Sequence, residues 1–192
     1  MIYLVRKTFQ YLWYYIWGHI FGFLFYEKKY YYGKWFTGKW KGFKAPGWRW
    51  IYIDTLGRKH NPNVPWPCSP YIVVGDYRNI HFHPDDINNF QGKGNLFQTW
   101  TDGNITIGKG TWIAQNVGII TTNHDLVNPD EHAEAKDVYL GEHCWIGMNS
   151  VILPGVILGD HTVVGAGSVV TKSFPEGYCV IAGNPAKKIK DL

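Results

Sequence analysis

His124 lies where a regular six-residue spacing of aliphatic residues is interrupted. Aliphatic residues recur every six positions from 107 to 119 and again from 140 to 170, but Ile119 and Leu140 are 21 residues apart, which is not a multiple of six. His124 lies in that interval, in the segment TTNHD. An imidazole has an unperturbed pKa of about 6.5, so it can take up or release a proton at neutral pH. The interval is therefore the first candidate for acid–base chemistry.

The other histidines and the cysteines give weaker indications of chemistry. His81 and His83 would share one face of a strand, but no third ligand accompanies them, so they do not support a metal site, and we expect no metal requirement. Cys144 has no histidine at a spacing that would activate it as a nucleophile. The sequence GAGS lacks the surrounding residues of a phosphate-binding loop, so nucleotide hydrolysis has no support.

A six-residue repeat indicates the elements that position these side chains. After the interval the sequence reads LGEHCW IGMNSV ILPGVI LGDHTV VGAGSV VTKSFP, with an aliphatic residue first in each hexad. A period of six fits neither a helix nor a simple strand alternation, and it is typical of a β-helix with one short strand and one turn per repeat. Each aliphatic side chain would point into a shared core and stack on its equivalent one coil away. The glycine that often follows it would make room at the corner.

The repeat divides the chain into three expected parts. Residues 71–192 are expected to form the β-helix, with a projecting loop over residues 121–138 and a basic tail over residues 176–192. Residues 1–30 are expected to form an amphipathic, aromatic helix. Residues 31–70 are expected to be an extended, basic arm, because four prolines between positions 62 and 70 exclude a helix or a central strand there.

The N-terminal part concentrates positive charge and aromatic residues. Residues 1–60 hold 11 Lys and Arg against 2 Asp and Glu, and 21 of the 33 aromatic residues. This composition indicates a negatively charged surface as partner. Residues 8–26 favour a helix that lies at a membrane surface, because Tyr and Trp prefer the headgroup level. Packing on the protein itself or on partner subunits is the alternative, and spanning the membrane is the least favoured one. The three scattered cysteines fit reduced thiols in the cytoplasm.

Four segments together resemble the hexapeptide-repeat acyltransferases: IAQNVGIITTNHD, CWIGMNSVILPGVILGD, VGAGSVVTKSFP and AGNPAKKI. Their order and spacing resemble the branch that contains galactoside and maltose O-acetyltransferases, hexapeptide-type chloramphenicol acetyltransferases and polysaccharide O-acetyltransferases. The resemblance covers about residues 61–192. It implies a left-handed parallel β-helix, a homotrimer and acetyl-CoA as the acetyl donor.

The resemblance also implies roles for individual residues in a groove between neighbouring β-helices. His124, on the projecting loop, would be the general base that removes a proton from a sugar hydroxyl, with direct transfer and no acyl-enzyme. Trp145 would line the groove. Asn95 and Gln98 are alternative candidates on the acceptor side, where this sequence departs from the galactoside branch. Asp125 is a further acceptor-side candidate, and orienting the loop or forming a simple turn are its alternative roles. The residues implied at the coenzyme A side are Gly165, Ala166, Thr171, Lys172, Lys187 and Lys190.

We therefore expect an acetyl-CoA-dependent O-acetyltransferase that acts on a sugar hydroxyl of a capsule, exopolysaccharide or other surface-glycan precursor. The expected partners are further copies of the chain, acetyl-CoA, a sugar or lipid-linked glycan acceptor and an anionic membrane surface, but no nucleic acid. The expected location is the cytoplasm, at the inner face of the cytoplasmic membrane. Two alternatives stay open, namely an N-acetyltransferase for an amino sugar or nucleotide sugar, and a non-catalytic β-helix scaffold.

Overall fold

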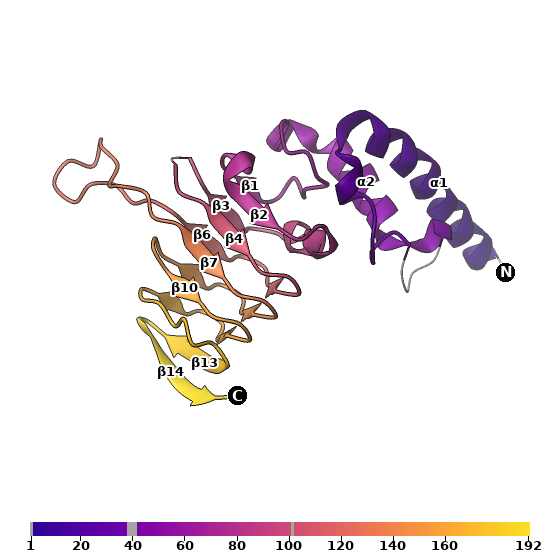
Figure 1. The fold of residues 1–192 in the computed structure, drawn as a ribbon. Helices are drawn as coiled ribbons and strands as arrows, with labels where there is room; N and C mark the ends of the chain where they lie inside the picture. The colour runs from indigo at the N-terminus through magenta and orange to yellow at the C-terminus, as the bar shows by residue number, and fades with distance from the viewer. Residues whose placement is uncertain (1, 38–41, 101) are drawn as a thin grey trace. The chain divides into compact units, whose positions relative to one another are not determined.

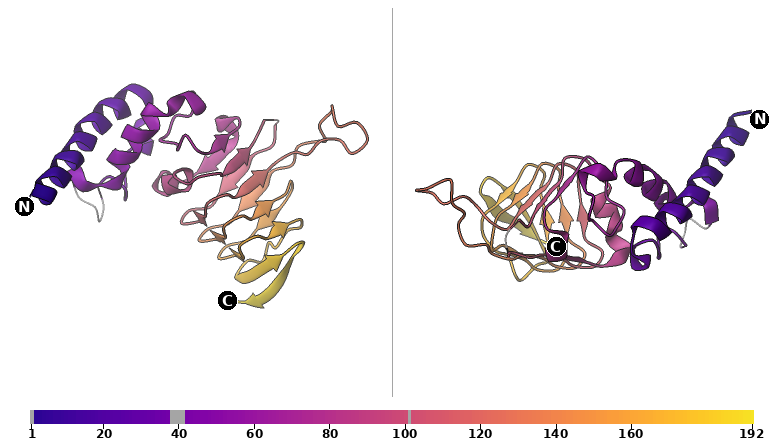
Figure 2. Two further views of the ribbon diagram at one scale, coloured as in Figure 1. Left: turned by 180° about the vertical axis from the view of Figure 1, so that it is seen from behind. Right: turned by 90° about the horizontal axis from the view of Figure 1, so that it is seen from above.

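The computed structural model describes residues 2–37, 42–100 and 102–192, and the chain divides into two compact units, residues 1–70 and 71–192. Helices make up the regular structure described in the first unit, and stacked strands dominate the second (Figures 1 and 2). The first unit contains α1 (Ile2–Phe25), α2 (Pro46–Leu56) and short 3₁₀ helices at Lys28–Tyr30, Gly42–Lys44 and Arg58–His60. The second unit contains short 3₁₀ helices at Tyr77–Asn79 and Pro84–Phe90 beside its strands.

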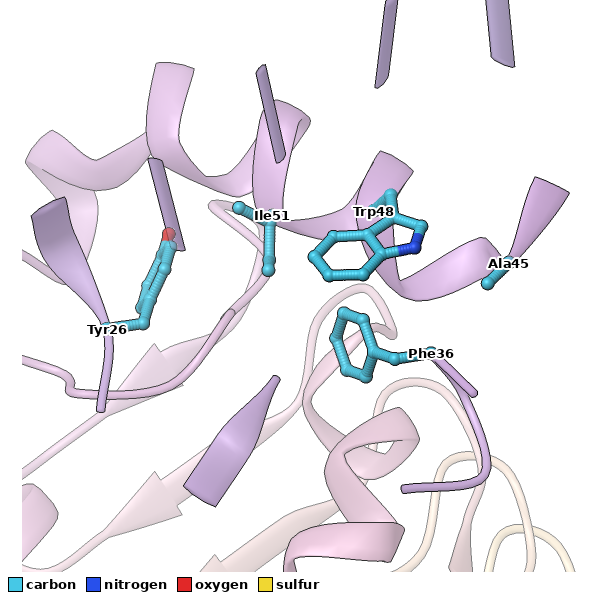
Figure 3. Close-up of a cluster of buried hydrophobic side chains, with 5 residues drawn as sticks. All are labelled: Tyr26, Phe36, Ala45, Trp48 and Ile51. Carbon is cyan, nitrogen blue, oxygen red and sulfur yellow. The ribbon is translucent and has the colours of Figure 1, made fainter. Parts of the chain in front are cut away.

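Helices α1 and α2 pack against each other through aromatic side chains. A Cβ atom at Gly18 would lie 3.0 Å from the carbonyl oxygen of Trp48, so the helices approach closely where a side chain is absent. Figure 3 shows the buried cluster, which consists of Tyr26, Phe36, Ala45, Trp48 and Ile51. The Phe36 ring meets the Trp48 ring edge-on, with centroids 4.9 Å apart, which is a favoured aromatic geometry. The first unit thus has a core of its own.

The expectation of an extended arm over residues 31–70 was wrong for residues 46–56, which form α2. Pro46 lies in the first turn, where a missing N–H removes no helical hydrogen bond. Trp48 and Ile51, three residues apart, share a face of the helix and are both buried. The proline-rich residues 62–70 contain neither helix nor strand, as their composition predicted.

Helix α1 is apolar on both faces, so the expectation of an amphipathic helix was also wrong. Tyr15 and Phe21 pack against the cluster that α2 helps to build, while Phe9 and Phe23 on the opposite side are exposed. Among the helices that the structure describes, none combines the length and the hydropathy that crossing a bilayer requires.

The described strands of the second unit stack in three sheets, which correspond to the faces of a β-helix. The first sheet contains β1 (Val73–Val74), β3 (Leu96–Gln98), β6 (Gly118–Ile120), β9 (Val151–Ile152) and β12 (Val169–Val170). The second contains β2 (Ile80–Phe82), β4 (Ile105–Ile107), β7 (Val138–Leu140) and β10 (Ile157–Leu158). The third contains β5 (Trp112–Ile113), β8 (Trp145–Ile146), β11 (Val163–Val164), β13 (Cys179–Gly183) and β14 (Ala186–Asp191). All pairs are parallel except β13 with β14.

The prediction that hexad aliphatic residues stack in the core is confirmed. Leu140 pairs with Leu158 in the second sheet, and Ile146 pairs with Val164 in the third, each one coil below its partner. All four side chains are buried. Each such burial stabilises the fold by about 1.5–3 kcal/mol, and the stack continues from coil to coil because every coil repeats it.

Glycines at one corner let successive coils approach closely. A Cβ atom at Gly108 would lie 2.3 Å from the carbonyl carbon of Gly141, and one at Gly141 would lie 2.6 Å from the backbone nitrogen of Asp160. Backbone atoms in a packed coil cannot move aside as a flexible side chain can. The corner therefore requires glycine, as the hexad pattern predicted.

We expect Gly141→Ala to lower the free energy of unfolding by about 2–3 kcal/mol, because the added methyl group overpacks a rigid corner. Gly118→Ala is the matched control, since its Cβ atom would lie 3.8 Å from a methyl group of Val151, an ordinary contact. The control should change stability by less than about 0.5 kcal/mol. Denaturant titration of both variants measures the difference, and equal stabilities would contradict the packing argument.

Candidate functional site

A loop over residues 121–137 leaves the stacked strands between β6 of the first sheet and β7 of the second, and it projects away from them (Figures 1 and 2). Gln98 fixes its root. The buried Gln98 carboxamide oxygen accepts hydrogen bonds from the backbone N–H groups of Thr121 and Thr122 at 3.0 and 3.1 Å. Its nitrogen donates to the Thr122 carbonyl oxygen at 3.1 Å. The loop therefore starts from a rigid point.

The two sides of the loop are joined by hydrogen bonds. The Asp125 N–H donates to the Glu131 carbonyl oxygen at 2.9 Å, and the Ala133 N–H donates to the Asn123 carbonyl oxygen at 2.9 Å. Residues 124 and 132 thus lie opposite each other in an antiparallel bridge. The two histidine rings stack there, with centroids 4.7 Å apart and an angle of 30° between their planes. The loop holds His124 in a defined position.

The hydrogen bond of His124 fixes where its ring can accept a proton. Its Nδ1 lies 2.7 Å from the Pro129 carbonyl oxygen. A carbonyl oxygen only accepts, so Nδ1 carries the hydrogen and donates it. In the neutral ring Nε2 is then the atom with the free lone pair, and the side chain is exposed. This is the tautomer that a general base needs when Nε2 faces the substrate.

Asp125 shapes the turn that brings Pro129 to His124. One carboxylate oxygen accepts from the backbone N–H groups of Val127 and Asn128 at 2.8 and 2.9 Å. These hydrogen bonds lower the pKa of Asp125 below its ordinary value. The turn therefore gains stability above an ordinary pKa of about 3.9 and loses it as the pH falls through the lowered value. Of the roles expected for Asp125, these contacts support the one in which it orients the loop.

Asp125→Ala should lower turnover about tenfold and leave the KM for acetyl-CoA nearly unchanged, because the turn that presents Pro129 to His124 loses both side-chain hydrogen bonds. Asp125→Asn is the matched control, since its amide oxygen can still accept from both N–H groups. Steady-state kinetics at pH 7 measures the split. An alanine variant that is as active as the asparagine variant would remove the positioning role.

The two other acceptor-side candidates are buried. Asn95 is 1% exposed, and its nitrogen donates to the Ala114 carbonyl oxygen at 3.0 Å inside the coil. Gln98 is 8% exposed and is occupied at the loop root. The expectation that either side chain contacts the sugar has no support in this geometry, because neither carboxamide reaches the surface of the chain.

The third sheet presents Trp145 on its outer face. Trp145 is exposed and pairs in register with the exposed Trp112 of the neighbouring coil. In-register residues on adjacent strands share a face, so the two indoles form one aromatic surface. The expectation that Trp145 lines a groove stays a prediction, and Trp112 is a neighbour that sequence reasoning missed.

Gly165 and Ala166 follow β11 at the corner between the third and first sheets. We expected Gly165 to leave room for coenzyme A, but a Cβ atom there would lie 2.8 Å from the Cβ atom of Ala182 in the next coil. The space is taken by the protein itself, so the glycine is required by coil packing. Ala166 is exposed at the same corner, and its small side chain protrudes little from the surface.

Strands β6, β9 and β12 pair in register, so their C-terminal ends lie at one edge of the first sheet. The loop begins at that edge after β6, and Thr171 and Lys172 lie at the same edge after β12. Adjacent strands are about 4.8 Å apart, so these residues lie about 10 Å along the stack from the loop root. Lys187 and Lys190 lie on β14 of the third sheet and are exposed. Within one chain, the residues assigned to coenzyme A thus lie at the two corners that flank the first sheet and on the third sheet.

The candidates that the sequence did not favour have structural roles. The ring of His81 shares a hydrogen bond of 3.0 Å with the Asn104 side chain, and no cluster of three potential metal ligands occurs among the described residues. Cys144 is buried, and burial raises the pKa of its thiol. A protonated, inaccessible thiol is unsuited to nucleophilic attack.

Comparison with known proteins adds to this geometry. Residues 137–172 match the family described as bacterial transferase hexapeptide (six repeats). WcaF of Escherichia coli (strain K12), provisionally named a colanic acid biosynthesis acetyltransferase, is 33% identical over 154 residues, which cover 75% of each chain. The chain belongs to the hexapeptide-repeat acetyltransferases.

Two further comparisons define how far the likeness extends. A Dictyostelium discoideum protein, provisionally named an acetyltransferase, is 47% identical over 92 residues, which cover 46% of this acetyltransferase and 47% of the relative. The chain thus matches about half the length of that relative. A galactoside acetyltransferase solved in complex with coenzyme A aligns with a TM-score of 0.53 and 24% identity, over 94% of this chain and 82% of that chain. At 24% identity, this last comparison shows a shared fold.

The loop contains two features that sequence reasoning missed. His132 was not among the candidate residues, and its ring stacks on that of His124. The Pro129 carbonyl oxygen, which selects the tautomer, carries no side-chain signal. Only the hairpin pairing of the loop brings both to residue 124, and that pairing leaves no repeat in the sequence.

Proposed function

We propose that this acetyltransferase transfers the acetyl group of acetyl-CoA to a sugar hydroxyl of a capsule, exopolysaccharide or other surface-glycan precursor. The observation that carries the proposal is the hydrogen bond from His124 Nδ1 to the Pro129 carbonyl oxygen, which leaves an exposed Nε2 as base. The name of WcaF, which refers to colanic acid biosynthesis, supports a glycan as the acceptor class.

His124 would work as the general base of a direct transfer. Acetyl-CoA supplies an activated thioester carbonyl, but a neutral sugar hydroxyl is a weak nucleophile until its proton is removed. Nε2 accepts that proton as the oxygen attacks, and the Pro129 carbonyl oxygen stabilises the imidazolium through Nδ1–H. The imidazolium then returns the proton to the departing sulfur, so no acyl-enzyme is needed. A placed base of this kind contributes about 10²–10⁴ in rate.

The residues assigned to coenzyme A include positively charged lysines and small side chains. Lys187 and Lys190 are exposed on β14, and no hydrogen bond or ion pair to another described residue engages either side chain, so both can approach phosphate groups. Lys172 adds a third cation near the loop edge. Ala166 and Thr171 would face the pantetheine, and Trp145 would wall the groove.

A trimer of left-handed β-helices would bring these residues together. His124 leaves one chain at the corner between the first and second sheets, whereas Ala166 lies at the corner between the third and first sheets. The first sheet separates the two corners within one chain. A groove between neighbouring chains would place the loop of one chain over the third-sheet surface of the next, which makes a closed ring of three equivalent sites.

Two alternatives differ from this proposal in what they predict. An N-acetyltransferase for an amino sugar or nucleotide sugar would use the same base. A non-catalytic scaffold would have no need for a loop that fixes one tautomer of an exposed histidine. The discriminating experiment compares release of coenzyme A with a sugar and with its amino counterpart. Faster release with the hydroxyl acceptor supports O-acetylation, faster release with the amine favours the first alternative, and no release favours the scaffold.

A further inference from the structure

One face of α1 is apolar and uncovered. Its side chains recur three or four residues apart, so they align along one side of the helix. Phe9 is 73% exposed and Phe23 is 80% exposed, although both are large hydrophobic residues. We name this surface the outer face of α1, and its residues are Val5, Phe9, Leu12, Trp13, Ile16, Ile20, Phe23 and Leu24. A contiguous exposed surface of this kind marks an interaction site.

The outer face is not needed to build the first unit. The opposite side of α1 makes the packing contacts, with Gly18 against Trp48 and Gly22 against Ile51. His19 stacks on Trp48 with ring centroids 3.8 Å apart. The core is therefore complete without the outer face, and its eight apolar side chains need another explanation.

Charge indicates the partner. Helix α1 contains no acidic residue and carries Arg6 and Lys7, and Lys28 and Lys29 follow its C-terminal end. Glu27, one of two acidic residues in the first 60, forms an ion pair with Lys29 at 2.9 Å. Cations at both ends of an apolar face match a surface that is apolar within and anionic at its boundary.

We propose that the outer face of α1 docks on an anionic phospholipid bilayer, with the helix lying along the membrane surface. A helix of 24 residues is about 36 Å long, so the whole outer face can meet the acyl boundary while the basic residues at its ends reach the headgroups. Trp13 suits the boundary between the acyl chains and the headgroups, where tryptophan is enriched. A second copy of the helix is a poorer occupant, because two strongly basic surfaces repel each other.

Point substitutions test this surface better than deletion. Tyr26 belongs to the buried cluster, so removing the N-terminal segment would disturb the fold of the first unit. Phe9→Glu combined with Ile16→Glu changes only exposed positions of the outer face. Leu56→Glu combined with Tyr32→Glu is the matched control, because both residues are exposed in the same unit but lie outside α1.

The experiment is flotation of the full chain with vesicles of phosphatidylcholine and phosphatidylglycerol, and with vesicles of phosphatidylcholine alone. The unchanged protein and the control variant should float with the anionic vesicles, and less at high salt. The outer-face variant should bind at least about tenfold more weakly. Circular dichroism checks that all three chains are folded.

Three outcomes would overturn the proposal. They are an unchanged protein that stays in the aqueous fraction, an outer-face variant that floats as well as the control, and equal flotation with neutral vesicles. If the protein does not float and the outer-face variant alone changes its sedimentation, a second copy covers the face instead. Flotation does not depend on acetyl transfer, so failure here leaves the proposed function to be judged by its own experiment.

Discussion

Replacing His124 with alanine should lower the turnover of acetyl transfer about hundredfold or more, while acetyl-CoA binds nearly as well as to the unchanged protein. The reason is that the alanine variant lacks the only ring atom that the Pro129 hydrogen bond leaves free to accept the proton, Nε2 of His124. The side chain is exposed on a projecting loop, so its removal should not disturb the β-helix. Single-turnover rates together with equilibrium binding of acetyl-CoA separate the two effects.

His132→Ala is the matched control for this experiment. Its ring stacks on that of His124, and the backbone bridge between the two residues does not depend on its side chain. We expect a loss of less than about tenfold, because the variant keeps the base and its hydrogen bond to Pro129. A His124→Ala variant with nearly unchanged turnover would remove His124 as the base.

Mixed trimers should recover activity from two inactive chains. One chain carries His124→Ala, and the other carries Ala166→Trp, which fills an exposed corner that we assign to coenzyme A. If each site takes its loop from one chain and its corner from the next, a site with both intact parts forms at one interface in four. Co-expression at equal levels should therefore restore about a quarter of the activity of the unchanged protein.

Each variant assembled alone supplies the control for the mixed trimers, and the two purified samples combined without subunit exchange supply another. All three should remain inactive. Failure of co-expressed chains to recover activity, although they assemble together, would place both residues of a site in one chain. Sedimentation that finds a fully active monomer would overturn the shared site altogether.

The β-helix could be predicted from the sequence because each of its coils repeats the same local requirement. An aliphatic residue at positions such as Leu140 and Ile146 stacks on its equivalent 18 residues later, so the spacing along the chain records the contact. The loop was visible for the same reason, as the interval in which the spacing failed. His124 was identified by the motif that surrounds it.

The sequence did not predict contacts that do not repeat. Gln98 was one of two alternative candidates on the acceptor side, together with Asn95. Its partners are backbone groups of Thr121 and Thr122, which no side-chain pattern records. Gly165 was assigned to coenzyme A from the resemblance alone. The close packing of Ala182 against it could not be predicted, because it depends on the exact approach of two coils. Helix α2 was missed because the surrounding prolines and basic residues indicated an extended segment. The contacts that stabilise it, between Trp48 and Ile51 and a separate helix, are not recorded in the local sequence.

Mass spectrometry of glycan intermediates incubated with the purified protein and acetyl-CoA tests the central claim most directly. The account predicts one acetyl group on the sugar in an ester that mild alkali removes, and its near absence when the His124→Ala chain replaces the unchanged one. An acetyl group that resists alkali would show an amide and contradict transfer to a hydroxyl. Equal acetylation by both chains would contradict the role of His124, and no acetylation of any soluble or lipid-linked sugar would contradict the proposed function itself.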